Sequence, residues 1–305
     1  MFVDKGETGR YTRINYFCGF SEGVNDILSN SGVIPVVILE DSSGSTKYMK
    51  TVLDTQVQQM VRKLKQNPFS DRVELSAVLF DEQISERAVW KRLHDVRDDV
   101  LDLSPAGETN TGAALKHVLS MIEKLKQDLQ HHGGRCAAPI VLMLTDGPVS
   151  PGEDATESKE NQYKEEYMEA ALQIKKLEQR EELRFAAVGI IQTARYKANM
   201  DQLKKLTVHP ERIFQANVEF WEDLELDEPI SWLNDQIRYA GEALEREPEP
   251  QKYTRQGAER RSNDRSRAQE PESQHWVSEA EEMPVYEICL DDVTLTFFGL
   301  KEGMN

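Results

Sequence analysis

The sequence has few cysteines, no excess of basic residues and no long hydrophobic run. Its three cysteines, Cys18, Cys136 and Cys289, are odd in number and far apart. A disulfide framework or a C-x-x-C site needs paired cysteines at short spacing, so this pattern disfavours both. Free thiols are typical of a reducing compartment, and we therefore expect a cytoplasmic protein.

Basic residues are outnumbered by acidic ones. The chain has 37 Lys and Arg against 54 Asp and Glu, which gives a formal net charge of −17. Nucleic-acid-binding domains normally carry a basic patch, and an acidic surface is repelled by anionic membranes. The N-terminus lacks the apolar core of a signal peptide, and no stretch is long enough to span a bilayer. We expect neither a nucleic-acid nor a membrane partner; the charge serves solubility or a basic protein partner.

Apolar segments suited to strands alternate with segments of helical periodicity. The predicted strands are Val33–Leu39, Val73–Phe80, Gln83–Trp90, Pro139–Thr145, Leu183–Ile191 and Ile213–Ala216. The predicted helices are Lys47–Gln66, Thr109–Gln130, Asn161–Arg180, Asn199–Leu206 and Trp221–Leu244, the last broken around Pro229. This alternation predicts an α/β fold with a doubly wound, mostly parallel, Rossmann-like sheet and helices on both faces.

Changes in composition divide the chain into segments. Residues 33–244 form the predicted domain, and residues 1–32 are an N-terminal extension in which 11–20 is a candidate strand. Residues 245–282 mix both charges with Pro, Gln and Ser, which predicts a disordered linker. Apolar runs return in 283–305 and predict a β-hairpin. Such a hairpin must bury itself on its own domain, which we favour, or on another protein.

Polar side chains follow the most apolar strands at the points where ligands bind to parallel sheets. Asp41, Ser43 and Ser45 follow the first strand, Thr109 is the first residue of the predicted helix 109–130, and Asp146 follows the strand that ends at residue 145. All the ligand atoms offered are hard oxygens, the set preferred by Mg²⁺. Each motif alone is also explained by helix capping. Three motifs in order favour a metal site.

The three motifs together resemble the metal-ion-dependent adhesion site of the von Willebrand factor A family. They are Asp-x-Ser-x-Ser at 41–45, Gly-x-Thr-x-Thr-Gly-x-Ala-Leu at 107–115 and Leu-Thr-Asp-Gly at 144–147. The resemblance extends over residues 33–239 and implies the fold predicted above.

The resemblance also implies a role for each ligand. Ser43, Ser45 and Thr109 would contact Mg²⁺ or Mn²⁺ through their hydroxyls, and Asp41 and Asp146 would hold it mainly through coordinated waters. In this family an Asp or Glu of a partner protein fills the open coordination position. The site then binds a partner and needs no catalytic residue.

Three residues depart from the family pattern. Glu40 stands where an apolar residue is usual, Thr46 stands where Met is common, and Glu108 replaces a Gly. The two glutamates have three explanations: they strengthen metal binding, one of them occupies the open position from within, or both point to solvent.

Other candidate sites have simpler explanations. His131, His132 and Cys136 suggest a second metal, but they also match a polar helix end. Ser42 and Ser43 have no histidine placed to activate a nucleophile.

Within the family, the sequence resembles bacterial tellurium-resistance-associated (TerY-like) proteins of stress-response and anti-phage defence systems. The segments that carry this likeness are Asn67–Phe69 and Ile230–Leu233. It implies a non-enzymatic, Mg²⁺-dependent interaction module that acts with a protein kinase or phosphatase. Two alternatives remain: an adaptor of a MoxR-type AAA+ ATPase, and a metal-dependent hydrolase that uses Asp41 or Glu40.

Overall fold

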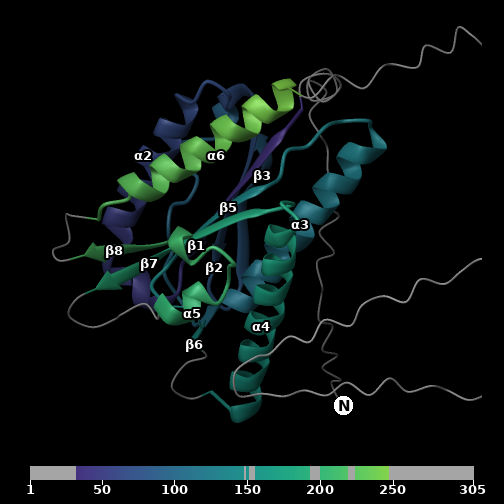
Figure 1. Ribbon diagram of the computed structural model, residues 1–305. Coiled ribbons are helices and arrows are strands. Elements are labelled where there is room, and N and C mark those ends of the chain that lie inside the picture. Colours follow the sequence, from purple (N-terminus) through teal and green to yellow (C-terminus); the bar gives the residue numbers. More distant parts are fainter. Residues whose placement is uncertain (1–31, 148, 151–154, 193–199, 219–223, 247–305) are drawn as a thin grey trace, which may run out of the picture. The chain divides into compact units, whose positions relative to one another are not determined.

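The computed structural model describes residues 32–147, 149–150, 155–192, 200–218 and 224–246 (Figure 1). They form a six-stranded sheet with the order β3-β2-β1-β5-β7-β8. Five strands are parallel: β1 (Ile34–Asp41), β2 (Val73–Phe80), β5 (Ile140–Thr145), β7 (Arg184–Gln192) and β8 (Ile213–Val218). The edge strand β3 (Ile84–Arg92) runs antiparallel to β2. The mostly parallel sheet predicted from the sequence is confirmed.

Helices cover both faces of this sheet. The helices are α2 (Lys50–Lys65), α3 (Thr111–His131), α4 (Glu157–Gln179), α5 (Met200–Lys204) and α6 (Asp227–Arg246). In Figure 1, α2 lies beside α6, and α3 lies beside α4. None of these helices, the ones within the described ranges, is long and apolar enough to cross a membrane.

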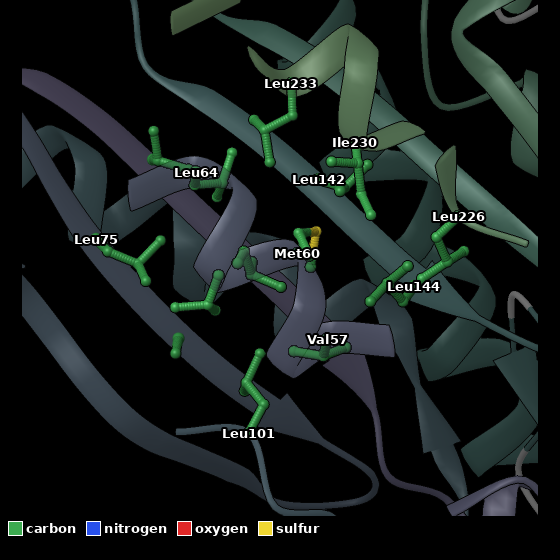
Figure 2. Packing of buried hydrophobic residues seen from close by; sticks show 14 of the residues in the cluster. Val57, Met60, Leu64, Leu75, Leu101, Leu142, Leu144, Leu226, Ile230 and Leu233 are labelled. Atoms are coloured by element: carbon green, nitrogen blue, oxygen red, sulfur yellow. The ribbon is translucent and has the colours of Figure 1, made fainter. Parts of the chain in front are cut away.

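Side chains of β1 alternate between two apolar cores. Val36 and Ile38 pack with α2 and α6, whereas Val37 and Leu39 pack with α3 and α4. All eight residues of β1 are buried because both faces are covered, which explains the continuous apolar run in the sequence. Figure 2 shows the first core, where side chains of α2 and α6 meet those of β2 and β5.

Several helices differ from the prediction at their ends, and α4 begins at Glu157, four residues before the predicted start. A 3₁₀ turn, Gly44–Tyr48, separates the loop after β1 from α2, so α2 begins at Lys50. The last helix is not broken at Pro229, and that prediction was wrong. Pro229 lies in the first turn of α6, where its missing N–H costs no intrahelical hydrogen bond.

A short ribbon was not predicted. Residues Thr109–Asn110 form β4, which pairs antiparallel with β6 (Val149–Ser150). The prediction had assigned Thr109 to the following helix, but α3 begins at Thr111. Two-residue strands carry too little periodicity to be recognised from sequence.

Several predicted segments lie outside the described residues. These are the candidate strand at 11–20, the hairpin at 283–305 and nearly all of the N-terminal extension and the linker. Residues 245–246, assigned to the linker, belong to the last turn of α6.

Candidate metal centre

The candidate ligands gather at the carboxyl end of the sheet. Asp41 is the last residue of β1, and Asp146 directly follows Thr145, the last residue of β5. Because β1 and β5 are hydrogen-bonded neighbours that run parallel, their polar ends reach the same edge. The fold therefore brings together residues that are far apart in the sequence.

Asp41 is held rigidly by both carboxylate oxygens. Its Oδ1 accepts a hydrogen bond from the backbone N–H of Ser43 at 2.9 Å. Its Oδ2 accepts one from the hydroxyl of Thr145 at 2.6 Å. Thr46 fixes the loop further, because its hydroxyl donates to the carbonyl of Ser43 at 2.8 Å. Thr46 is thus part of the loop architecture.

A chain of hydroxyl protons links the first motif to the third. Ser45 Oγ donates to Asp146 Oδ1 at 2.9 Å, and Ser43 Oγ lies 3.0 Å from Ser45 Oγ. A serine hydroxyl has only one proton, so Ser43 is the donor to Ser45. Both protons point toward the carboxylate, which leaves a lone pair on each serine oxygen for a cation.

Backbone hydrogen bonds attach the second motif to the first. The N–H of Gly44 donates to the carbonyl of Gly107 at 3.1 Å, and the N–H of Ala106 donates to the carbonyl of Ser42 at 2.9 Å. Gly107 has φ +66°, a conformation that favours glycine. Thr109 follows two residues later and is 3% exposed. Within the described residues its hydroxyl makes no hydrogen bond to the other candidate ligands.

Helix capping does not explain Thr109 or Thr111. The side chain of Asn110 caps α3, because its Oδ1 accepts a hydrogen bond from the N–H of Ala113 at 3.0 Å. The buried hydroxyl of Thr111 has no hydrogen-bond partner in the described part of the chain. The capping alternative is therefore wrong for these two threonines.

Negative charge at the centre is not neutralised by the protein. Burial raises the pKa of Asp41 above its usual range, and the nearby Asp146 raises it further. Burial also raises the pKa of Asp146. No Lys, Arg or His among the described residues forms an ion pair with either side chain. Buried carboxylates without a cation are unfavourable, so a bound cation would relieve both.

An unpartnered oxygen marks where such a cation fits. Asp146 Oδ2 is buried and has no hydrogen-bond partner among the described residues. It lies on the carboxylate that also receives the hydroxyl chain from Ser45. Carboxylate and hydroxyl oxygens are the donors that Mg²⁺ and Mn²⁺ prefer. The residues present match the metal that the motif implies.

Glu40 faces away from this centre. It lies opposite Leu79 and Leu144 in the sheet, and both of these side chains belong to the core under α2 and α6. Since side chains alternate along a strand, Glu40 and Asp41 point to opposite faces. Glu40 is 1% exposed, so its predicted alternative of pointing to solvent is wrong. Burial, with smaller contributions from Asp54 and Asp41, raises its pKa.

Glu108 lies at the rim of the metal centre, where two residues of α4 contact it. Lys159 Nζ lies 2.5 Å from its Oε2, and the hydroxyl of Tyr163 donates to the same oxygen at 3.2 Å. The Lys159 ammonium also lies 5.6 Å from the ring centroid of Tyr163. These contacts give Glu108 partners of its own, so it is not required as a metal ligand.

The second suggested cluster shows no metal geometry. His132 Nδ1 contacts the carbonyl of Asp128 at 2.7 Å at the end of α3. Burial raises the pKa of the Cys136 thiol to about 11, so it stays protonated. Among the residues that the structure describes, no three His, Cys, Asp or Glu side chains are grouped to hold a metal ion.

Sequence reasoning missed two residues that shape the centre. Thr145 orients Asp41, and Asn110 joins the centre to α4 through a 3.0 Å hydrogen bond from Nδ2 to Glu166 Oε2. Thr145 directly precedes Asp146, and that adjacency was the available signal. The contact of Asn110 with α4 depends on tertiary packing, and no local pattern indicates it.

The family model for the von Willebrand factor type A domain matches residues 36–227. No curated protein matches the chain. Solved structures do match. One is proximal thread matrix protein 1 from the mussel byssus, solved with a zinc-occupied MIDAS motif. It is 17% identical to this chain, the match covers 69% of this chain and 48% of that chain, and the TM-score is 0.42.

Two further structures come from other organisms. The vWF domain of the pilus tip protein Mfa5 from Porphyromonas gingivalis is 11% identical, with 70% of this chain and 96% of that chain covered and a TM-score of 0.45. The manganese-loaded TRAP protein of Plasmodium vivax is 19% identical, with 68% and 74% covered and a TM-score of 0.45. The chain spans about half the length of the mussel structures, at 48%, 47% and 48%.

Proposed function

The chain belongs to the von Willebrand factor type A family, and from this premise we propose that it is a non-enzymatic, Mg²⁺-dependent protein-interaction module. Domains of this family mediate protein–protein interactions. In the proposal, Ser43, Ser45 and Thr109 hold the ion directly, and Asp41 and Asp146 hold it through water. The boundaries 33–244 for the module, with appended segments on both sides, and its cytoplasmic location are parts of the same proposal.

One observation carries this proposal. The hydroxyl protons of Ser43 and Ser45 run toward a buried carboxylate whose other oxygen has no partner among the described residues. This arrangement leaves oxygen lone pairs and negative charge together, without a protein cation. Each oxygen of Asp41 accepts one hydrogen bond, from Ser43 N–H or from Thr145, which places the serine loop and leaves lone pairs for metal-bound water.

The bound ion would supply a positive charge with an open coordination position. Mg²⁺ keeps several waters when few protein ligands reach it, and one of these is replaced by an incoming carboxylate. Because hydroxyls are neutral, the ion would keep charge that attracts a partner's Asp or Glu. Glu40 faces the opposite side of the sheet and Glu108 is paired with Lys159, so neither needs to fill that position.

Titration with Mg²⁺ alone tests the metal site. Isothermal titration calorimetry should show binding to the wild-type chain and its loss in Asp146→Ala and Ser45→Ala. Ser120→Ala, at an exposed serine in the middle of α3, should bind as wild type does. Equal Mg²⁺ affinity in all four proteins would contradict the proposal.

The partner is a finer part of the proposal. We place the module in a bacterial stress-response or anti-phage defence system, beside a kinase or phosphatase, on the TerY-like resemblance of 67–69 and 230–233. A MoxR-type ATPase is the alternative partner. Pull-downs against each candidate, in Mg²⁺ and in EDTA, separate the two, and an interaction that survives EDTA would argue against a metal-mediated contact.

A further inference from the structure

The amino end of the sheet, opposite the metal centre, contains a charged pocket. It is open to solvent, has a volume of about 610 Å³ and lies where β7 and β8 begin. This volume is within the roughly 300–1,000 Å³ of small-molecule sites. Its charged and polar lining comes from the end of α4 and the turn after it, the first residue of β7 (Arg184), the turn before β8 and the outer face of α6.

Arg184 has only neutral partners in this pocket. Its guanidinium stacks on the ring of Tyr239 at 4.3 Å from the centroid. Its Nη1 donates to Gln236, at 3.1 Å to the side-chain oxygen and 3.4 Å to the carbonyl. In the described part of the chain it forms no ion pair with a carboxylate. Its fixed position and unneutralised charge are unusual for a half-buried arginine.

Arg212 is only weakly neutralised. Its side chain is 24% exposed, and within the described residues its ion-pair partner is Glu178 Oε1 at 3.7 Å, while the carboxylate of Glu211 acts on it at longer range. The other oxygen of Glu178 accepts from the Thr207 hydroxyl at 2.6 Å and from the N–H of Val208 at 3.0 Å. Glu178 therefore serves mainly to hold this loop, and Arg212 keeps donors for a ligand.

The two arginines lie close enough to repel each other. Burial first, and then the charge of Arg212, lowers the pKa of Arg184. Both guanidiniums remain charged at neutral pH. An anion between them would remove this repulsion and fill their free donors.

Most acidic side chains of the lining are already paired. Asp235 pairs with Arg238 at 2.9 Å, and Glu242 pairs with Arg246 at 3.0 Å. Glu181 is exposed and acts on Arg184 only at longer range. Within the described part of the chain, Arg184 and Glu181 are thus the charged groups of the lining without an ion pair, and Arg184 is the one held in place, by Tyr239 and Gln236.

We propose that this pocket binds a phosphoryl group between Arg184 and Arg212, with Tyr239 holding the guanidinium plane of Arg184. Two arginine forks offer parallel N–H donors that match the oxygens of a phosphoryl dianion. A single carboxylate would neutralise only one of them. The phosphoryl group is carried by a small phosphate compound or by a phosphorylated side chain. The site does not depend on the metal centre.

Calorimetry on the full chain in EDTA tests this pocket without interference from bound metal. The probes are inorganic phosphate, a phosphoserine peptide and the same peptide unphosphorylated. Arg184→Gln and Arg212→Gln should each weaken phosphoryl binding roughly 10- to 100-fold, the loss expected for hydrogen bonds to a charged group. Arg97→Gln, which changes the charge equally at an exposed ion pair with Asp99, should bind as wild type does.

A second set of variants guards against misfolding. Arg184→Lys keeps the charge but loses the planar fork, so its affinity should fall between those of wild type and Arg184→Gln. Glu181→Gln removes a repelling charge and should tighten binding severalfold. Tighter binding of the phosphopeptide assigns a phosphorylated side chain as the source, and equal binding of free phosphate assigns a small compound. Absence of phosphoryl binding to wild type, or unchanged binding in folded Arg184→Gln and Arg212→Gln, would overturn the proposal.

Discussion

The two ends of the parallel sheet have opposite charge imbalances. At the carboxyl end, Asp41 and Asp146 are buried without a protein cation in the described part of the chain. At the amino end, Arg184 has only neutral partners, and Arg212 has one ion pair at 3.7 Å. Buried or half-buried charge is unfavourable unless it is paired, so a ligand of the opposite charge would stabilise each end.

This difference also separates binding roles from structural ones. Glu178 is as buried as the metal-site aspartates, but a hydroxyl, a backbone N–H and an arginine surround it. Its Oε2 therefore holds the loop before β8, whereas its Oε1 has no hydrogen bond among the described residues and lies 3.7 Å from Arg212. The difference between the two sites is the cation: Glu178 has one in Arg212, and Asp41 and Asp146 have none in the described part of the chain.

The largest expected effect is at the metal end. Asp41→Asn keeps the shape of the side chain and removes its charge. Loss of a residue that supports the metal ligands from the second layer typically lowers metal affinity by up to roughly 100-fold, and Asp41→Asn should lower Mg²⁺ affinity at least as much. In EDTA at pH 8 the same variant should melt at a higher temperature, because an uncompensated buried charge is gone. Calorimetry and thermal unfolding measure both.

The matched control is Asp99→Asn, an exposed carboxylate paired with Arg97 at 2.6 Å. It should change neither property. If Asp41→Asn melts at a lower temperature in EDTA and binds Mg²⁺ as wild type does, Asp41 is not an uncompensated charge that a metal ion neutralises.

Glu74 provides a buried carboxylate with a cation across the strand pair. It lies opposite Arg92, and burial raises its pKa to about 7 against the opposing effect of Arg92. The folded state thus binds the proton more tightly than the unfolded chain. As the pH rises from about 4.5 to 7, the free energy of unfolding of wild type should therefore fall relative to that of Glu74→Gln, by up to about 3 kcal/mol.

Urea unfolding at pH 5 and pH 8 measures this difference. Addition of Mg²⁺ should leave the difference between wild type and Glu74→Gln unchanged, because Glu74 lies on β2, away from the metal loops. If the stabilities of the two proteins change with pH in parallel, burial does not raise the pKa of Glu74.

Close backbone packing at the metal end predicts a third effect. A Cβ on Gly112 would lie 2.4 Å from the N of Tyr167 and 2.6 Å from the C of Glu166, so α3 and α4 would have to separate. Gly112→Ala should lower the free energy of unfolding by about 1–3 kcal/mol. Gly147→Ala is the control, since no atom lies within 4 Å of its added Cβ, and denaturation should detect little change.

The smallest effect is expected at the rim. Lys159→Ala breaks a partly exposed ion pair with Glu108, and such pairs contribute about 1 kcal/mol or less to stability. Glu108→Gln should change Mg²⁺ affinity by less than roughly tenfold, below the range for outer-shell partners. A loss as large as that of Asp41→Asn would identify Glu108 as a group that closes the metal site from within.

The fold was largely predictable because its signals are local. The strand Val73–Phe80 was predicted with its observed boundaries, since a run covered on both faces is apolar along its whole length. The candidate ligands Asp41 and Asp146 were also predicted, because each lies at the carboxyl end of such a run, within two residues of its last apolar side chain. Whether these residues bind metal stays a prediction.

Other features depend on contacts between distant segments. The pocket around Arg184 joins the end of α4, the turn before β8 and α6, and none of these segments has a motif of its own. The orientation of Glu40 follows from strand alternation, but its burial without a partner depends on how α2 covers the sheet. The 3₁₀ turn after Ser43 is stabilised by the Thr46 hydroxyl, and in the sequence Thr46 stood out only as a departure from the family pattern.

The metal site can be located in a crystal structure with Mn²⁺ by anomalous scattering. We expect one strong peak bounded by Ser43, Ser45 and Thr109, with Asp146 close enough to reach it directly or through water. A peak elsewhere, or no peak in crystals soaked at millimolar Mn²⁺, would contradict this expectation.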